Sequence, residues 1–215
     1  MKKFISFLFA ITLLTSVFAQ QKVDALAQYN NGRKAEGAGN KQEATQLYQS
    51  AVDACYAELK EKPNNIESYV VLTWALLRME KYPETIAECN KALKIKPNEY
   101  RIVETLGEAT FYNKQYAASM PYFEQYVNAM PSSAARYSTA YFFMGEIYRI
   151  QKKWEHADIA YSTAVRFSPR ASLWWYRLGS VRESSGNKEL AKAAYQQALS
   201  IRPNYPDAQA ALQRL

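Results

Sequence analysis

The stretch WYRLGSVRESSGNKELAKAAYQQALSIRP, from Trp175 to Pro203, holds the spacing that decides the fold. Its marked residues are Trp175, Leu178, Gly179, Arg182, Ala191, Tyr195 and Ala198, which stand 28, 25, 24, 21, 12, 8 and 5 residues before Pro203. Counting back from Pro169 by the same offsets gives Tyr141, Met144, Gly145, Tyr148, Ala157, Tyr161 and Ala164. Two segments of the chain therefore share one pattern of large, small and helix-ending residues.

Five prolines set the period of this pattern. Pro63, Pro97, Pro131, Pro169 and Pro203 follow one another at 34, 34, 38 and 34 residues. A unit of this length cannot bury a core by itself, so each unit is expected to stack on its neighbours. Proline lacks a backbone donor and clashes with the preceding turn, so each proline is expected to end a helix. The spacing therefore predicts an all-α array of helical hairpins.

The residues before Pro169 and Pro203 resemble the tetratricopeptide repeat, whose W-x2-L-G-x2-Y, A-x3-F and P signature marks a helix–turn–helix unit. The segment before Pro203 departs from that signature only at Arg182. The resemblance implies an all-α, right-handed α-solenoid of about five such units over residues 20–215. The units are expected at residues 24–63, 64–97, 98–131, 132–169 and 170–203, followed by a capping helix at residues 206–215.

Small residues at fixed offsets predict how the helices of one hairpin meet. Glycine in a helix interior costs about 1 kcal/mol relative to alanine, so its presence needs a compensating contact. Gly107, Gly145 and Gly179 are expected to allow close approach of the second helix of their hairpins. Ala157 and Ala191 are expected to keep that second helix tight against the first.

Two departures from an even period predict local differences. In the first unit the pattern fits better when it is moved seven residues upstream, which is about two helical turns. We therefore expect a lengthened second helix from Lys41 to Lys62. The four extra residues between Pro131 and Pro169 fall in residues 132–137, and we expect them to extend the next first helix backwards by about one turn.

Residues 1–19, MKKFISFLFAITLLTSVFA, predict a secretory signal peptide. Lys2 and Lys3 precede an apolar run of about 15 residues, shorter than the roughly 20 residues that span a bilayer. Cleavage is expected after Ala19, and the alternative is an uncleaved membrane anchor. A periplasmic or secreted location follows from this interpretation.

Charge and composition argue against nucleic acid as a partner. The formal net charge of +7 falls to about +5 without Lys2 and Lys3. Basic residues are interleaved with glutamates throughout the repeats, and the sequence has no block of five or six like charges. The remaining charge gives at most a weak attraction to acidic surfaces.

The sequence offers no residue set for catalysis, metal binding or a cofactor, so an enzyme is not expected. His156 is the only histidine, and Glu155 and Asp158 beside it fit a solvated helix face. Cys55 and Cys89 are expected to be buried thiols, with a disulfide as the alternative.

In the family that the chain resembles, the first helices line a concave face that usually binds peptides or helices. Outward positions on those helices predict a groove with aromatic and mixed-charge residues, although about half of the rings are expected to pack between helices. The predicted partner-binding residues are Tyr29, Arg33, Trp74, Arg78, Glu108, Tyr112, Phe143, Glu146, Arg149, Tyr176 and Arg177.

These observations predict a protein–protein interaction adaptor or scaffold of the bacterial cell envelope. Its partner is expected to be another envelope protein, held by an extended or helical segment in the concave groove. The alternative is an accessory component of a transport system that binds a small hydrophobic ligand. The aromatic content, with 17 tyrosines and 4 tryptophans, is compatible with both.

Overall fold

The computed structural model describes residues 23–215, and this part of the chain contains eleven helices and no strand. The predicted signal peptide lies outside the described residues. The helices are α1 (Ala25–Gly37), α2 (Lys41–Glu61), α3 (Ile66–Arg78), α4 (Tyr82–Ile95), α5 (Tyr100–Tyr112), α6 (Tyr116–Ala129), α7 (Tyr137–Ile150), α8 (Trp154–Phe167), α9 (Ser172–Ser184), α10 (Lys188–Ile201) and α11 (Pro206–Arg214).

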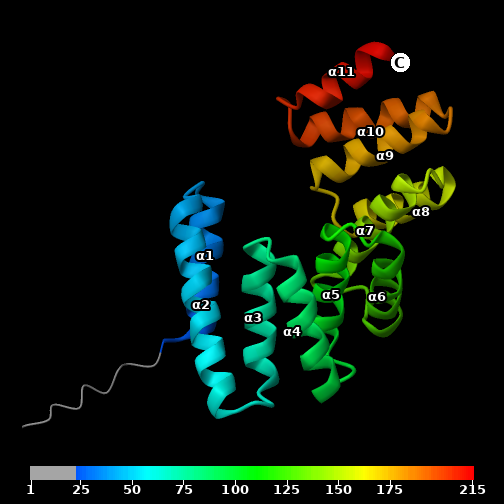
Figure 1. The fold of residues 1–215 in the computed structure, drawn as a ribbon. Coiled ribbons are helices and arrows are strands. Elements are labelled where there is room, and N and C mark those ends of the chain that lie inside the picture. The colour runs from blue at the N-terminus through cyan, green and yellow to red at the C-terminus, as the bar shows by residue number, and fades with distance from the viewer. Residues whose placement is uncertain (1–22) are drawn as a thin grey trace, which may run out of the picture.

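Consecutive helices form antiparallel hairpins that stack side by side into a curved array (Figure 1). The first helices, α1, α3 and α5, contact one another in turn, and α5 also contacts α7. The array turns between α5 and α9, so that α9, α10 and α11 lie across an open space from α1 and α2 (Figure 1). This arrangement is the helical solenoid that the proline period predicts.

Helix ends follow the sequence signals closely. Each second helix stops two residues before its proline, and the two-turn lengthening of α2 is present, with an end at Glu61. Asp24 caps α1 by accepting a hydrogen bond from the backbone amide of Ala27 at 3.0 Å. Asn65 caps α3 by accepting one from the amide of Glu67 at 3.2 Å. The terminal helix α11 has Pro206 at its first position, where the missing amide costs nothing.

The hairpin turns each contain one residue in the left-handed backbone region. Gly39 and Gly186 take this role in the α1–α2 and α9–α10 turns, with φ of 85° and 83°. Glu80, Lys114 and Lys152 take it in the three hairpins between, with φ of 60°, 62° and 57°. A side chain in this region is strained, so these three turns are less favourable than the two with glycine.

Glycines in the first helices lie directly under large rings of the second helices. A Cβ added at Gly179 would lie 2.6 Å from the ring of Tyr195, and one at Gly145 would lie 2.7 Å from the ring of Tyr161. Gly107 faces Phe123 with slightly more room, at 3.0 Å. These positions therefore exclude any side chain unless the facing ring moves.

The connection between α6 and α7 differs from the prediction. It runs over residues 130–136, which is seven residues, whereas the connections before α3, α5, α9 and α11 have four each. Helix α7 has 14 residues against 13 in α3, α5 and α9, so it takes only one of the four extra residues. The predicted extension of α7 by a full turn is therefore wrong, and three of the extra residues lie in the connection. That connection carries Arg136 towards the first helices.

Tyrosines of the second helices link successive hairpins through carboxylates. The hydroxyl of Tyr48 donates to Glu36 at 2.6 Å, and Glu36 also pairs with Arg78 on α3. At the C-terminal end, Tyr195 donates to Glu183 at 2.6 Å, and Glu183 pairs with Arg214 on α11 at 2.8 Å. A buried hydroxyl needs such a partner, so each link satisfies the tyrosine and holds the next helix.

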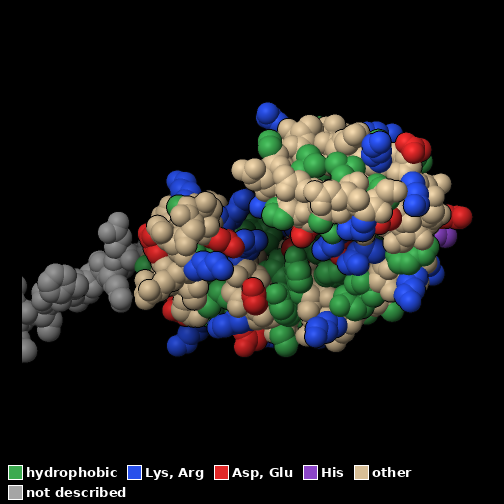
Figure 2. Space-filling model, turned by 90° about the horizontal axis from the view of Figure 1, so that it is seen from above, with side chains coloured by type: hydrophobic (Ala, Val, Ile, Leu, Met, Phe, Trp, Pro, Cys, Tyr) green, Lys and Arg blue, Asp and Glu red, His purple; other side chains and the backbone are tan. Residues whose placement is uncertain are grey.

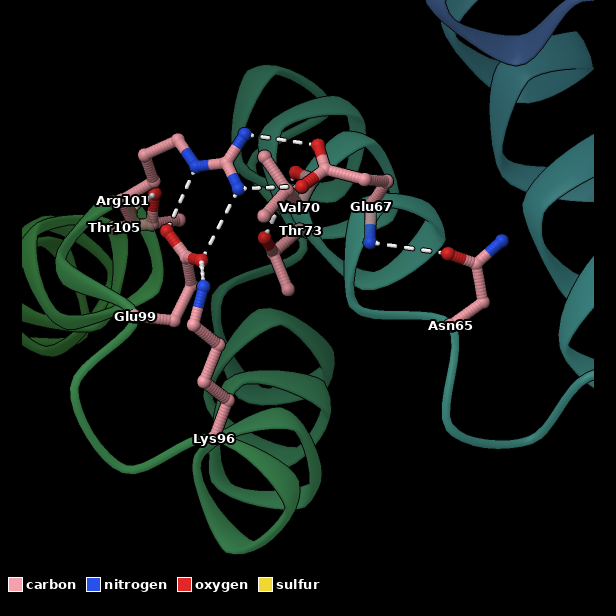
Figure 3. Close-up of polar contacts among 8 residues, drawn as sticks. All are labelled: Asn65, Glu67, Val70, Thr73, Lys96, Glu99, Arg101 and Thr105. Carbon is pink, nitrogen blue, oxygen red and sulfur yellow. Dashed lines mark hydrogen bonds and ion pairs between the residues drawn. The ribbon is translucent and has the colours of Figure 1, made fainter.

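A further charged cluster joins α3 and α5 at their N-terminal ends (Figure 3). Arg101 donates two hydrogen bonds to Glu67, at 2.9 and 2.7 Å, and two to Glu99, at 2.7 and 3.1 Å. Lys96 donates to the same Glu99 carboxylate at 2.8 Å. These hydrogen bonds lower the pKa of Glu99 to about 2, chiefly through Arg101.

Cys55 and Cys89 are both buried free thiols in the structure. Burial raises the pKa of Cys55 to about 12, so its thiol stays protonated at neutral pH. Within residues 23–215, no helix has the length and apolar character needed to span a bilayer, and no group of His, Cys, Asp and Glu side chains has a geometry suited to a metal ion.

Candidate binding groove

The first helices enclose a groove of about 490 Å³, which we call the concave groove. Its lining comes from α1, α3, α5, α6 and α7 and from the connection between α6 and α7, namely Tyr29, Asn30, Arg33, Trp74, Leu77, Arg78, Arg101, Glu104, Thr105, Glu108, Tyr126, Ala135, Arg136 and Thr139. Four arginines and two glutamates line one space. Figure 2 looks down on the molecule and shows basic and acidic side chains around a hollow.

The glutamates at the floor of the concave groove are buried, and a single arginine covers them. Glu104 and Glu108 lie one turn apart on α5, with side chains only 5% and 10% exposed. Arg136 donates to Oε1 of Glu104 from Nε at 3.0 Å and from Nη2 at 2.7 Å, and it forms an ion pair with Glu108. Burial raises the pKa of Glu104 in spite of the nearby guanidinium. The floor therefore carries two carboxylates against one cation.

The arginines along the rim differ in their partners. Arg78 is held by Glu36, and Arg101 is held by Glu67 and Glu99. Arg33 on α1 is exposed and makes no ion pair or hydrogen bond with any residue in the described part of the chain. Arg33 is therefore free to meet a carboxylate from outside.

Aromatic rings form the α1 and α3 side of the concave groove. Tyr29 and Trp74 lie with ring centroids 5.5 Å apart, and Tyr29 also contacts Tyr48 behind it. Tyr29 is buried and Trp74 is half-buried, so Trp74 presents the larger free surface. Rigid rings of this kind bury large area at small entropic cost when a partner covers them.

A second charged cluster lies on α7 and α9, beyond the lining of the concave groove. Glu146 is buried and accepts a hydrogen bond from Arg149 at 2.7 Å and from the hydroxyl of Tyr161 at 2.5 Å. Arg177 on α9 forms an ion pair with the same carboxylate at 3.0 Å. Two guanidinium groups therefore share one carboxylate, which leaves an excess of positive charge there.

The structure brings together five of the eleven predicted partner-binding residues. Tyr29, Arg33, Trp74, Arg78 and Glu108 line the concave groove. The other six lie on α5, α7 and α9, outside that lining.

The prediction that Phe143 faces the groove is wrong. Its side chain is 4% exposed and its ring stacks on Phe123 at a centroid distance of 5.1 Å. Phe143 stands 26 residues before Pro169, and the residues at the same offset in the two preceding units, Val71 and Thr105, are also buried. This offset therefore faces the space between helices, where the Phe143 ring packs with Phe123 and Tyr126.

The remaining predicted residues contact other side chains of the protein. Tyr112 is 46% exposed and stacks on Tyr82 at 5.4 Å. Tyr176 is half-buried against Tyr195 and Tyr205, and the Arg177 guanidinium lies 6.0 Å from the centroid of its ring. Glu146, Arg149 and Arg177 form the second charged cluster.

Sequence reasoning missed Arg136, which is the side chain that covers the floor of the groove. The signal is present, because the 38-residue interval from Pro131 to Pro169 marks an insertion at this point. Because the sequence predicts that the four inserted residues are helical, the loop that positions Arg136 is not expected. The links between hairpins also have a sequence signal: Glu36 and Glu183 stand 12 residues before Tyr48 and Tyr195, whereas apolar Phe111 stands 12 before Phe123.

Comparison with known proteins finds a tetratricopeptide repeat near the C-terminus. Residues 175–205 match a sequence model of the tetratricopeptide repeat. Residues 175–205 therefore carry the sequence pattern of one tetratricopeptide repeat. No curated protein sequence matches it at a significant level.

Solved tetratricopeptide repeat structures share its fold at low sequence identity. MamA from Desulfovibrio magneticus is 20% identical over 85% of this chain and 97% of its own, with a TM-score of 0.61. A thermophilic protein from Thermus thermophilus, TTC0263, is 16% identical over 89% of this chain and 98% of its own, with a TM-score of 0.66. YrrB, described as having an unusual peptide-binding site, is 19% identical over 89% and 93%, with a TM-score of 0.61.

Proposed function

We propose that this tetratricopeptide repeat protein is an interaction scaffold that binds a polypeptide segment in the concave groove. The observation that carries the proposal is the groove itself, in which an aromatic wall, an unpaired arginine and a charged floor line one space of about 490 Å³. Apolar contact with Trp74 supplies affinity, and the charged residues select the register of the bound segment. The ten helices α1 to α10 form five repeats in this proposal, with α11 as the cap.

The charged lining favours a polypeptide over a small hydrophobic ligand. Sites for apolar ligands are lined mainly by apolar side chains with few polar groups. The concave groove instead contains four arginines and two glutamates, which suit the mixed side chains and backbone of a peptide. The peptide-binding site described for YrrB, which shares the fold, agrees with this mode of binding.

The cell envelope is the proposed location, and residues 1–19 support it through their secretory signal pattern. Mass spectrometry of the chain purified from the periplasm tests this point. A mature mass that begins at Gln20 agrees with export and cleavage, and a full-length mass from the cytoplasm contradicts both.

Site-specific photocrosslinking tests the groove as the binding surface. A benzophenone amino acid replaces Asn30, which is exposed on α1 at the groove, or Asn90, which is exposed on the second helix α4 outside the groove lining. We expect a discrete crosslinked polypeptide from position 30 in native extracts and none from position 90. Equal products from both positions would show that the groove is not the preferred surface.

A further inference from the structure

The floor of the concave groove has the composition of a cation site. Glu104 and Glu108 present two carboxylates from one face of α5, and both side chains are at least nine-tenths buried. Unpaired carboxylates are not stable in such surroundings, so a cation must compensate for their burial. In this structure the guanidinium of Arg136 does so.

One nitrogen of the Arg136 guanidinium, Nη2, contacts both carboxylates. Arg136 uses Nε and Nη2 on a single oxygen of Glu104. Oε1 of Glu108 is buried and accepts no hydrogen bond from the described residues, although it lies in ion-pair contact with Arg136. The two carboxylates therefore share one donor nitrogen, and a guanidinium that offers each carboxylate its own donor can pair with them better.

Arg136 contacts these carboxylates from a loop, so its side chain can move away. It is the last residue of the seven-residue connection between α6 and α7, outside any helix, and its side chain is 45% exposed. The carboxylates, in contrast, are fixed on the interior of α5. A competing cation can therefore replace Arg136 without unfolding a helix.

We propose that Glu104 and Glu108 form a receptor for one guanidinium group of the bound partner, and that Arg136 occupies this receptor in the free protein. The proposal deepens and rests on the proposed function, because it assigns an arginine of the partner segment to the floor of the concave groove. Two carboxylates favour a guanidinium, since its planar set of five N–H donors can bridge both.

The rim restricts the partner to a single basic residue at this point. Arg33 lines the same space without an ion pair among the described residues, and its positive charge opposes a run of lysines or arginines. The unpaired Arg33 instead favours an acidic residue near the partner's arginine. The expected segment is therefore one arginine in an otherwise apolar or acidic sequence.

The experiment removes the Arg136 side chain from the two glutamates and adds a small arginine derivative in its place. N-acetyl-arginine methylamide is titrated into purified Arg136→Ala protein, and binding is followed by thermal shift and by nuclear magnetic resonance of the Trp74 indole. The uncharged citrulline derivative of the same shape is the matched control. We expect the arginine derivative to bind about tenfold or more tightly than the citrulline derivative. Wild-type protein is expected to respond less than Arg136→Ala, because its own arginine competes.

Removal of the carboxylates completes the test. Adding Glu104→Gln and Glu108→Gln to Arg136→Ala should abolish the preference for arginine over citrulline. Equal binding of the two derivatives to Arg136→Ala, or an unchanged preference in the triple variant, overturns the proposal. If Arg136→Ala does not fold, Arg136→Gln takes its place, and circular dichroism checks each variant.

The outcome does not depend on finding the natural partner. A failed crosslinking experiment with a preserved arginine preference rejects the proposed function alone. Successful crosslinking without that preference rejects only the guanidinium receptor.

Discussion

Replacing Gly179 by alanine tests the packing that holds each hairpin together. The new Cβ would lie 2.6 Å from two ring atoms of Tyr195, which is closer than carbon atoms approach without a clash. Tyr195 cannot easily move, because its side chain is fully buried and its hydroxyl is fixed on Glu183 at 2.6 Å. The substitution therefore forces the two helices apart or turns the ring out of its position.

The expected cost combines two opposing effects. Overpacking costs about 1–3 kcal/mol. Alanine recovers about 1 kcal/mol of helix propensity relative to glycine, so the net loss is on the order of 0–2 kcal/mol. For a chain of this size each kcal/mol moves Tm by about 2–4 °C. Gly179→Leu adds three more carbon atoms at the same point and should lose the full overpacking cost or more.

Gly37→Ala is the matched control, because a Cβ there meets nothing within 4 Å and the residue is also helical. This variant should hold or raise Tm through propensity alone. The pair is compared by urea and thermal unfolding, with helical content followed by circular dichroism. If Gly179→Ala and Gly37→Ala change stability equally, the ring contact does not limit the hairpin and the packing argument is wrong.

Three further predictions concern other contacts of the described residues. Glu99→Gln should lower the free energy of unfolding by up to about 3 kcal/mol at pH 7, because the folded pKa of Glu99 is about 2 against an ordinary 4.5. This stabilisation is present above pH 4.5 and disappears as the pH falls towards 2, so the unfolding free energies of variant and wild type, measured by urea titration, should converge there. A difference that does not change with pH would reject the ion cluster as the cause. Lys114→Gly should raise the free energy of unfolding by about 0.5–1 kcal/mol, since φ is 62° at this position and glycine adopts such an angle without strain. Gly186→Ala should lower it for the same reason. A loss of stability in Lys114→Gly contradicts the left-handed conformation of this turn. Tyr161→Phe should lower the free energy of unfolding by about 1–2 kcal/mol, because buried Glu146 loses a hydroxyl donor. Tyr148→Phe is the control and should change stability little, because the Tyr148 hydroxyl makes no hydrogen bond with the described residues. Equal losses in chemical denaturation would argue against the hydrogen bond between Tyr161 and Glu146.

The helices and their ends could be predicted because local rules determine them. Each repeat proline marks the end of a second helix, and the seven-residue shift before Pro63 locates the longer α2. Glycines opposite large rings are also a local signal, since residues 16 positions apart, such as Gly179 and Tyr195, must meet in any hairpin of this length.

The floor of the groove could not be predicted in the same way. An insertion of four residues can be added to a helix or to a loop, and only the packing of α6 against α7 decides between them. The loop places Arg136 on Glu104, 32 residues earlier, where it covers the buried carboxylates of Glu104 and Glu108. The burial of Phe143 has a different origin, because it lies two residues before Gly145 just as buried Thr105 lies two residues before Gly107.

The central claim is that the partner binds in the concave groove, and isothermal titration of the crosslinked segment against two tryptophan variants tests it most directly. Trp74 lines the groove on α3, and Trp154 is also half-buried but starts the second helix α8. We predict that Trp74→Ala weakens binding at least about 30-fold, as expected for a central interface aromatic residue that costs about 2 kcal/mol. Trp154→Ala should leave the affinity unchanged. Equal affinities for wild type and Trp74→Ala, with helical content preserved, would contradict the account.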